Sequence, residues 1–438
     1  MRVLSNVGVL VGAVLLLGCG SSDSNATGMG NSGGSGNSGG NGGSDSGTGA
    51  SAGSGGSVGG FGGGSLGGNG GVGASAGTSG TPNPKLANLG AGDAMDLGAF
   101  ECTTPSDVCS RVTDYSGFVF DSVSHRFLMF GGGHSTTMTD AIFAFDLEGS
   151  LTWKELHEPT PCSMMVASNL DATKGAWVAG NSGPYPRPLA VHTYDLLGFA
   201  PAQNEFVLIS RLFSGGYCNT TGNDVGGPVA HFGLSTGSWS FSDAQSGSAA
   251  NIDASEYDPV SGRILIFGRS GIGFYDPALR TNTLLVSSYD GDKLKNSQGT
   301  TVDFGALGYA NHMVYFPPTD TFYYFVRGNP VGVFALKLDR ANPKNSILDE
   351  VSTKGPSSPH TEPGYAYDSK NQIIGGAVTD STFYAFDPAT STWSAHPIAG
   401  SPGSQAFHAL GYDPLNNVFI FVTDYDSGAK TWAYRLAG

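Results

Sequence analysis

At residues 125–137 the chain reads His-Arg-Phe-Leu-Met-Phe-Gly-Gly-Gly-His-Ser-Thr-Thr. A short apolar run ends there in three glycines and His134. The same pattern, an apolar run after a turn loosely of the type Tyr-Asp-Pro-x-x-Gly or Asn, returns five more times. The later copies cover residues 199–211, 257–269, 316–327, 367–378 and 412–424. Because a recurring segment predicts a recurring structural unit, this repeat decides the fold.

The part of the chain that carries the repeat, residues 84–438, is rich in Phe, Tyr, Val, Thr and Gly. Short apolar runs, frequent turns and few stretches of helical period predict an all-β domain. Residues 143–153, 231–239 and 384–393 each indicate a hairpin with a Trp on its outer strand. The anchor positions of the repeated turn are Ser122, Pro201, Pro259, Pro318, Ser369 and Pro414. Their spacing is typical of four-stranded units joined by variable loops.

Two glycines after the second strand, and a Trp after the turn between the third and fourth strands, resemble the kelch repeat and the galactose-oxidase-like propeller. The resemblance implies a six-bladed β-propeller over residues 84–438. Seven blades are the alternative, because the first two anchors are far apart in the sequence. The last unit, residues 407–436, has three strands of its own, and we expect a strand near residues 86–97 to supply the fourth.

The first 19 residues combine Arg2, an apolar segment and the sequence Leu16-Leu17-Gly18-Cys19. So short an apolar segment predicts a signal peptide rather than a membrane-spanning helix. The cysteine resembles the lipobox of bacterial lipoproteins, which implies lipidation of Cys19 and an outer-membrane lipoprotein that is periplasmic or surface-exposed. A plain secretory signal with a chance cysteine is the alternative. Residues 20–83 are almost all Gly, Ser, Asn, Ala and Thr, which predicts a disordered tether with an end-to-end distance of roughly 45 Å.

The net charge of −15 argues against nucleic acid as a partner. Besides Cys19 the chain has four cysteines, an even number that predicts two disulfides in an oxidising compartment. Cys102 and Cys109 are the local pair, and Cys162 and Cys218 would then join two loops. No spacing indicates a metal site or a cofactor, although the sequence does not exclude a divalent ion such as Ca²⁺ or Zn²⁺. We expect a monomer.

Polar residues recur at the strand ends of the repeat. If each unit reverses at every turn, the start of its first strand and the end of its second strand lie at the same end of the unit. Six or nine residues before the anchors stand His192, Tyr309, His312, His360 and His408. About ten residues after the anchors stand Arg211, Arg269 and Arg327, with His134 slightly further on in the first copy and Arg187 just upstream of His192.

This placement predicts a positively charged mouth of a central channel, which suits an anionic ligand because arginine binds carboxylate and sulfate bidentately. Local ion pairs are the alternative for each arginine. We expect the ligand to be an acidic, uronic-acid-containing polysaccharide. The substrate-binding residues would be Arg211, Arg269, Tyr309, His312, Arg327, His360 and His408.

The stretch Arg187-Pro-Leu-Ala-Val-His192-Thr-Tyr194, together with His134, is similar to the sites of bacterial propeller lyases that cleave uronic-acid polysaccharides. The similarity implies that Arg187 or another arginine neutralises the uronate carboxylate. His192 or His134 would act as base, and Tyr194 or Tyr309 as acid. We therefore expect cleavage by β-elimination. The alternative is a non-catalytic kelch-type module of the cell envelope that binds glycan or protein.

Overall fold

The computed structural model describes most of the chain from residue 80 onward. The described residues are 80–100, 102–103, 106–109, 111–133, 138–178, 185–209, 218, 227–245, 254–268, 271–287, 291–303, 307, 311–328, 330–356, 362, 364–423 and 429–436. All of them belong to one compact unit, Asn69–Gly438.

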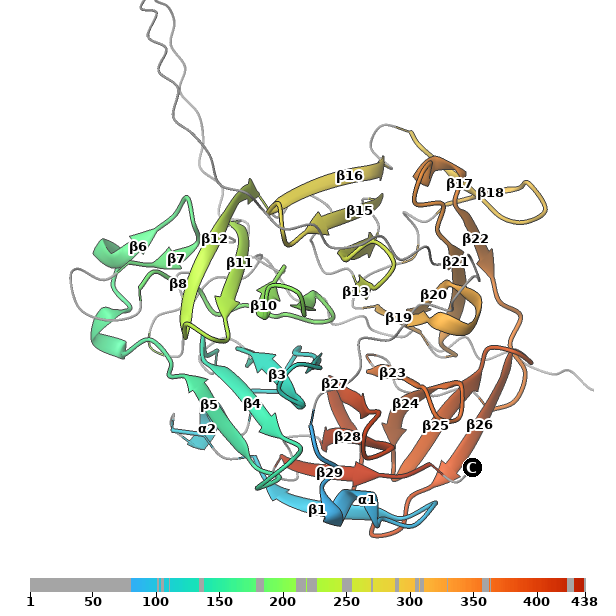
Figure 1. Cartoon of the computed structure of the whole chain (residues 1–438), viewed down its shortest axis with the longest axis horizontal. Coiled ribbons are helices and arrows are strands. Elements are labelled where there is room, and N and C mark those ends of the chain that lie inside the picture. The colour runs from blue at the N-terminus through green and yellow to red at the C-terminus, as the bar shows by residue number, and fades with distance from the viewer. Residues whose placement is uncertain are drawn as a thin grey trace, which may run out of the picture. The chain divides into compact units, whose positions relative to one another are not determined.

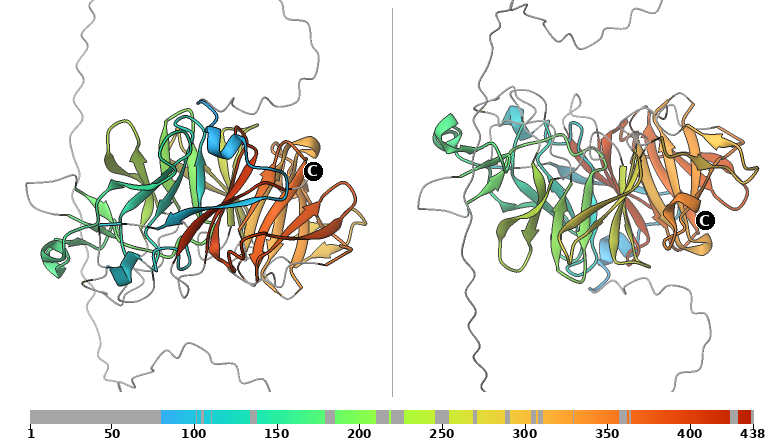
Figure 2. Two further views of the ribbon diagram at one scale, coloured as in Figure 1. Left: turned by 90° about the horizontal axis from the view of Figure 1, so that it is seen from below. Right: turned by 90° about the horizontal axis from the view of Figure 1, so that it is seen from above.

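The unit is built from antiparallel sheets, which confirms the prediction of an all-β chain (Figure 1). Helix in the described part is limited to α1 (Pro84–Ala87), α2 (Ser106–Cys109) and a few 3₁₀ turns. Seen edge-on in Figure 2, the sheets lie beside one another in one layer.

Six sheets of four or more strands can be followed through the described residues. Sheet 1 is β2 (Val119–Asp121), β3 (Arg126–Phe130), β4 (Ile142–Asp146) and β5 (Trp153–His157). Sheet 2 is β9 (Leu197–Ala200), β10 (Glu205–Leu208), β11 (Pro228–Gly233) and β12 (Ser238–Gln245). Sheet 3 is β13 (Ala254–Asp258), β14 (Arg263–Gly268), β15 (Gly271–Asp276) and β16 (Thr281–Ser287).

The second half of the chain continues the pattern. Sheet 4 is β19 (His312–Phe316), β20 (Thr321–Val326), β21 (Gly332–Lys337) and β22 (Ile347–Glu350), extended by β17 (Leu294–Lys295) and β18 (Thr301–Val302). Sheet 5 is β23 (Tyr365–Asp368), β24 (Ile373–Thr379), β25 (Thr382–Asp387) and β26 (Thr392–Pro397). Sheet 6 is β27 (Gln405–Asp413), β28 (Val418–Thr423), β29 (Lys430–Tyr434) and β1 (Ala94–Ala99).

Sheet 6 joins the two ends of the described chain, as the sequence led us to expect. β1 pairs antiparallel with β29, with Met95 opposite Ala433. The bounds differ from the expected strand near residues 86–97, because Pro84–Ala87 form α1 and the pairing starts only at Ala94. Asn83 caps this helix by accepting a hydrogen bond from the Lys85 amide at 3.0 Å.

A four-residue turn links the first two strands of every sheet. The last residue of the first strand pairs with the first residue of the second strand, as in Asp121 with Arg126, Asp258 with Arg263 and Asp413 with Val418. In sheet 4 the pair is Phe316 with Thr321, so the turn begins at Pro317. The anchor that we placed at Pro318 is therefore wrong by one residue, because two consecutive prolines make the sequence pattern ambiguous there.

The hydrophobic core consists of separate clusters, most of which lie between neighbouring sheets. Phe130 and Phe206 share a cluster between sheets 1 and 2, and Phe127 and Ile420 share one between sheets 1 and 6. Similar clusters join sheets 2 and 3, 3 and 4, 4 and 5, and 5 and 6. Each sheet therefore buries both of its faces against its two neighbours.

Both predicted disulfides are present. Cys102 is bonded to Cys109, and Cys162 is bonded to Cys218. The second bond starts beside a small additional sheet of β6 (Leu170–Asp171), β7 (Ala176–Trp177) and β8 (Arg187–Pro188), which lies at the outer edge of the unit (Figure 1).

Candidate functional site

The first strands of the six sheets lie side by side and surround one cavity. β2 contacts β9 on one side and β27 on the other. Between them, β9 contacts β13, β13 contacts β19, β19 contacts β23, and β23 contacts β27. A cavity of about 360 Å³ is lined by residues of all six strands. We call the ends where these strands start their entry ends, and the ends at the four-residue turns their turn ends.

At the entry ends, four of the predicted site residues form one group of rings with Tyr115 and Phe407. The ring of His192 lies 4.5 Å from that of Tyr115 and 5.8 Å from that of Tyr194. Tyr194 in turn lies 6.0 Å from His408, and His408 stacks on His312 at 5.7 Å. Phe407 packs on Tyr115 at 4.3 Å. We call these six residues the ring cluster.

The backbone holds the ring cluster in an uncommon conformation. Tyr115, Tyr194 and Phe407 have φ values of 56°, 47° and 33°, a region that bulky side chains rarely adopt. Such residues cost of the order of 1–3 kcal/mol each and tend to occur at functional sites. The Tyr194 amide donates a 2.7 Å hydrogen bond to the Tyr115 carbonyl, which fixes the segments before β2 and β9 against each other.

Glycine is required where these segments meet. A Cβ on Gly117 would lie 2.6 Å from the Tyr194 carbonyl oxygen and 3.4 Å from Cβ of His408. Any larger residue would therefore push apart the two segments that carry Tyr194 and His408.

Asp195 reaches from the segment before β9 to β19 and closes the cavity at the entry ends. Its Oδ2 accepts a 2.8 Å hydrogen bond from the Met313 amide, and its Oδ1 lies 3.0 Å from Nδ1 of His312. Nε2 of His312 donates to the Tyr365 carbonyl at 2.7 Å. Strands β9, β19 and β23 are thereby connected through two side chains.

Burial determines the charge of this pair. It lowers the pKa of His312 to about 4 and raises the pKa of Asp195 well above its usual value. Both shifts disfavour the charged form of the group concerned, because burial removes water from it. His312 therefore supplies no positive charge for a ligand, and it positions the ring of His408 instead.

Two of the predicted arginines are engaged elsewhere. Nη1 of Arg327 lies 2.8 Å from Oε1 of Glu362, so this arginine forms an ion pair, but with the segment before β23 and not with an acid of its own sheet. Arg187 is buried in β8, where its Nη1 donates to the Glu158 carbonyl at 2.8 Å and its guanidinium lies over the Tyr185 ring. The contacts of Arg187 are thus distinct from those of His192, although the two are close in sequence.

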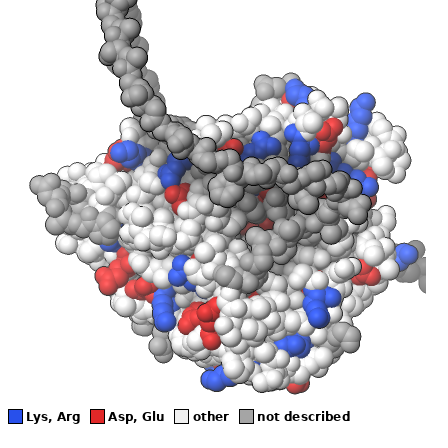
Figure 3. Space-filling model, viewed as in Figure 1, with Lys and Arg blue, Asp and Glu red and all other residues white. Residues whose placement is uncertain are grey.

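The remaining predicted residues lie outside the described part of the chain: Cys19, His134, Arg211, Arg269, Tyr309 and His360. On the side of the molecule seen in Figure 3, the described Lys and Arg side chains are mixed with Asp and Glu rather than gathered in a patch of one sign.

Sequence reasoning did not propose Tyr115, Phe407 or Asp195 for the site. Tyr115 and Phe407 each stand directly next to a residue six positions before an anchor, Ser116 and His408. Asp195 itself stands six positions before the anchor Pro201. No sequence signal showed that it would reach across to β19.

Among the described residues, no three His, Cys, Asp or Glu side chains gather as a metal ion would require. No helix in that part of the chain has the length and apolarity needed to cross a membrane.

No family model matches the sequence, and no curated protein matches it. Among solved structures the chain is similar to a structural genomics protein of unknown function from Bacteroides thetaiotaomicron, with 10% identity and a TM-score of 0.45. The similarity covers 82% of this chain and 75% of that chain. It carries no argument about fold or function.

Proposed function

We propose that residues 84–438 form a six-bladed, kelch-like β-propeller. The support is the cyclic order of contacts between the first strands and the six clusters between neighbouring sheets. In this arrangement β1 completes the sixth blade, and pairing the two ends of the chain in one sheet closes the ring.

We further propose that the ring cluster binds an acidic polysaccharide and cleaves it by β-elimination. The observation that carries this proposal is that His192 and Tyr194, from one segment, lie in one group with His408 from another, and that three of the six residues in this group, Tyr194 among them, have strained backbone conformations. Aromatic rings with a few polar groups among them are typical of binding sites for small molecules and sugars.

In the proposed reaction His192 takes the proton from the carbon next to the uronate carboxylate. The bond from the neighbouring ring carbon to the glycosidic oxygen breaks, a carbon–carbon double bond forms, and Tyr194 donates its proton to the leaving oxygen. The rings of these two residues are 5.8 Å apart, a separation that one sugar ring can span. Neutralising the carboxylate falls to Arg211 and Arg269, since Arg187 and Arg327 are engaged with Glu158 and Glu362.

The second candidate is a non-catalytic module that binds glycan or protein. The ion pair of Arg327 with Glu362 favours it, because a paired arginine contributes less to recognising an anion. In both cases we propose that lipidation at Cys19 and a tether over residues 20–83 hold the domain at the outer membrane as a monomer.

The experiment is to incubate the purified protein with a panel of uronic-acid polysaccharides and to follow the ultraviolet absorbance of an unsaturated product. We expect His192→Ala to lower the rate by about 10²-fold or more, which is the usual contribution of a general base. The matched control is His396→Ala on the outer strand β26, where the imidazole bonds Ser394; it should leave the rate unchanged.

Thermal melting of both variants separates loss of chemistry from loss of fold. Cleavage that persists in a folded His192→Ala variant would show that this residue is not the base. Retained polysaccharide binding without any absorbance change would favour the non-catalytic module.

A further inference from the structure

The central cavity is a second site, which shares only His312 with the ring cluster. At the entry ends it is closed by buried residues, namely Asp195, His312 and Tyr365. At the turn ends its lining includes Pro259 and Pro317, which are exposed. The cavity is therefore a pit that opens at the turn ends, away from the ring cluster.

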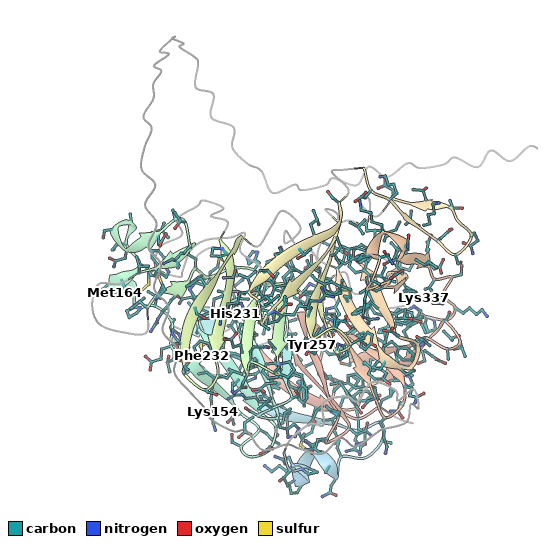
Figure 4. All side chains as sticks on the ribbon, turned by 45° about the horizontal axis from the view of Figure 1, so that its top comes forward. Lys154, Met164, His231, Phe232, Tyr257 and Lys337 are labelled. Carbon is teal, nitrogen blue, oxygen red and sulfur yellow. A yellow bond between two sulfur atoms is a disulfide. The ribbon has the colours of Figure 1, made fainter. Side chains whose placement is uncertain are left out.

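Every first strand contributes an aromatic residue to the wall of this pit at the same position. Each of these residues stands directly before the last residue of its strand. The six are Phe120, Phe199, Tyr257, Tyr315, Tyr367 and Tyr412. Figure 4 shows Tyr257 in the middle of the unit, whereas Lys154 and Lys337 lie at its periphery. The repeat has thus placed a belt of aromatic residues around one opening.

Charged groups in the lining are all of one type. Asp195 and Glu256 carry the carboxyl groups, and no Lys or Arg is among the described residues that line the cavity. Glu256 accepts a 2.9 Å hydrogen bond from the Tyr257 amide, which holds its side chain near the belt. Around the opening, Asp121, Asp258, Asp368 and Asp413 end their strands and accept hydrogen bonds from the turns.

We propose that this cavity binds a small organic cation of the alkylammonium class, held by the aromatic belt and by the Glu256 carboxylate. A cation is attracted to the faces of aromatic rings, and aromatic enclosures are the usual receptors for quaternary ammonium groups. This site shares only His312 with the proposed polysaccharide site and would hold a ligand of opposite charge.

Proton release should accompany binding. Burial raises the pKa of Glu256 to about 8, so this group is largely protonated at neutral pH without a ligand. A bound cation favours the carboxylate and drives its proton into solution. The titratable and charged groups around Glu256 are Asp195 on the β9 side, Tyr257 on β13, His312 and Tyr315 on β19, Tyr365 and Tyr367 on β23, Tyr412 on β27, and Asp258, Asp320 and Arg340 at the opening.

The test is calorimetric titration of the full chain with choline and with 3,3-dimethylbutan-1-ol, the neutral molecule of the same shape. We expect choline to bind at least tenfold more tightly than the alcohol at pH 7. Repeating the titration in two buffers of different ionisation enthalpy should reveal that protons are released when choline binds but not when the alcohol binds. Equal affinity for the two molecules, or no binding of choline at millimolar concentration, would overturn the proposal.

Variants then locate the site. Glu256→Gln should weaken choline binding at least tenfold and abolish the proton release, whereas Glu350→Gln, at an exposed carboxyl on β22, should change neither. His192→Ala should leave choline binding intact, which keeps this result separate from the fate of the proposed lyase. Full choline affinity in a folded Glu256→Gln variant would exclude the cavity as the site.

Discussion

Glu256 illustrates what burial does to a single residue in this protein. Its carboxyl group has backbone amides as partners, including that of Tyr257 at 2.9 Å, but no Lys or Arg in the described lining of the cavity. Desolvation therefore dominates over these hydrogen bonds and raises its pKa from 4.5 to about 8. Folding therefore becomes less favourable with rising pH over the range in which this carboxyl group is ionised in the unfolded chain but still protonated in the folded chain.

The first stability prediction follows from this shift. Between pH 4.5 and 8 the folded state holds a proton on Glu256 that the unfolded state has lost, so its contribution to stability falls as the pH rises through that window. Glu256→Gln removes the titration. We expect the variant to match the natural protein at pH 5 and to exceed its free energy of unfolding by of the order of 1–3 kcal/mol at pH 8.

Melting temperatures at pH 5, 6.5 and 8, measured without added cation, check this expectation. A difference between the two proteins that stays constant with pH would show that Glu256 titrates normally in the folded state.

At the scale of the element, β1 determines whether the edge of sheet 6 is covered. It covers the edge of β29, where Ala94 pairs with Tyr434 and Ala99 with Lys430. Lys430 also forms an ion pair with Asp96 on β1, at 2.9 Å. Without β1, the edge of β29 would present unpaired amides and carbonyls to solvent, which favours aggregation.

Deleting the chain through residue 100 removes β1, and we expect this to lower the free energy of unfolding by several kcal/mol. Because each kcal/mol shifts the melting temperature by a few degrees, the melting temperature should fall by more than about 5 °C. The matched control is a chain that begins at residue 80. Since the sequence predicts a tether before that point, this control should melt like the full chain. Equal melting of the longer deletion would mean that β1 contributes little to sheet 6.

For the whole molecule, stability depends on contacts between neighbouring sheets. Arg340, which follows β21 in sheet 4, reaches Asp258 of sheet 3 with Nε and Nη2 at 2.8 and 2.9 Å. The same guanidinium binds Asp320 through Nη1 at 2.8 Å. Asp258 is fully buried, whereas the side chain of Asp320 is 52% exposed.

The two carboxylates should therefore differ in importance. Arg340→Ala leaves Asp258 buried and uncompensated, and we expect a loss of about 3 kcal/mol in the free energy of unfolding. Asp320→Asn removes only the exposed partner and should cost less than about 1 kcal/mol. Urea unfolding of both variants measures the difference. Similar losses would contradict the view that burial of Asp258 sets the strength of this link.

The sequence alone predicted the all-β class, both disulfides and the contribution of an N-terminal strand to the last sheet. It also placed His192, His312 and His408 at the same ends of their units, because each stands five to nine residues before a repeated turn. These features are local or periodic, so a pattern along the chain contains them. The ambiguity at Pro317 and Pro318 marks the limit of such patterns, because register depends on pairing with the next strand.

Only the tertiary structure decided which partners the charged residues near the repeated turns have. Asp195 binds the Met313 amide of β19, Arg327 pairs with Glu362, and Arg187 donates to the Glu158 carbonyl. Each of these contacts joins segments that are unrelated by the repeat. The charge, protonation and solvent exposure of a side chain depend on its neighbours in three dimensions. A sequence repeat determines only the position of each residue within its own sheet.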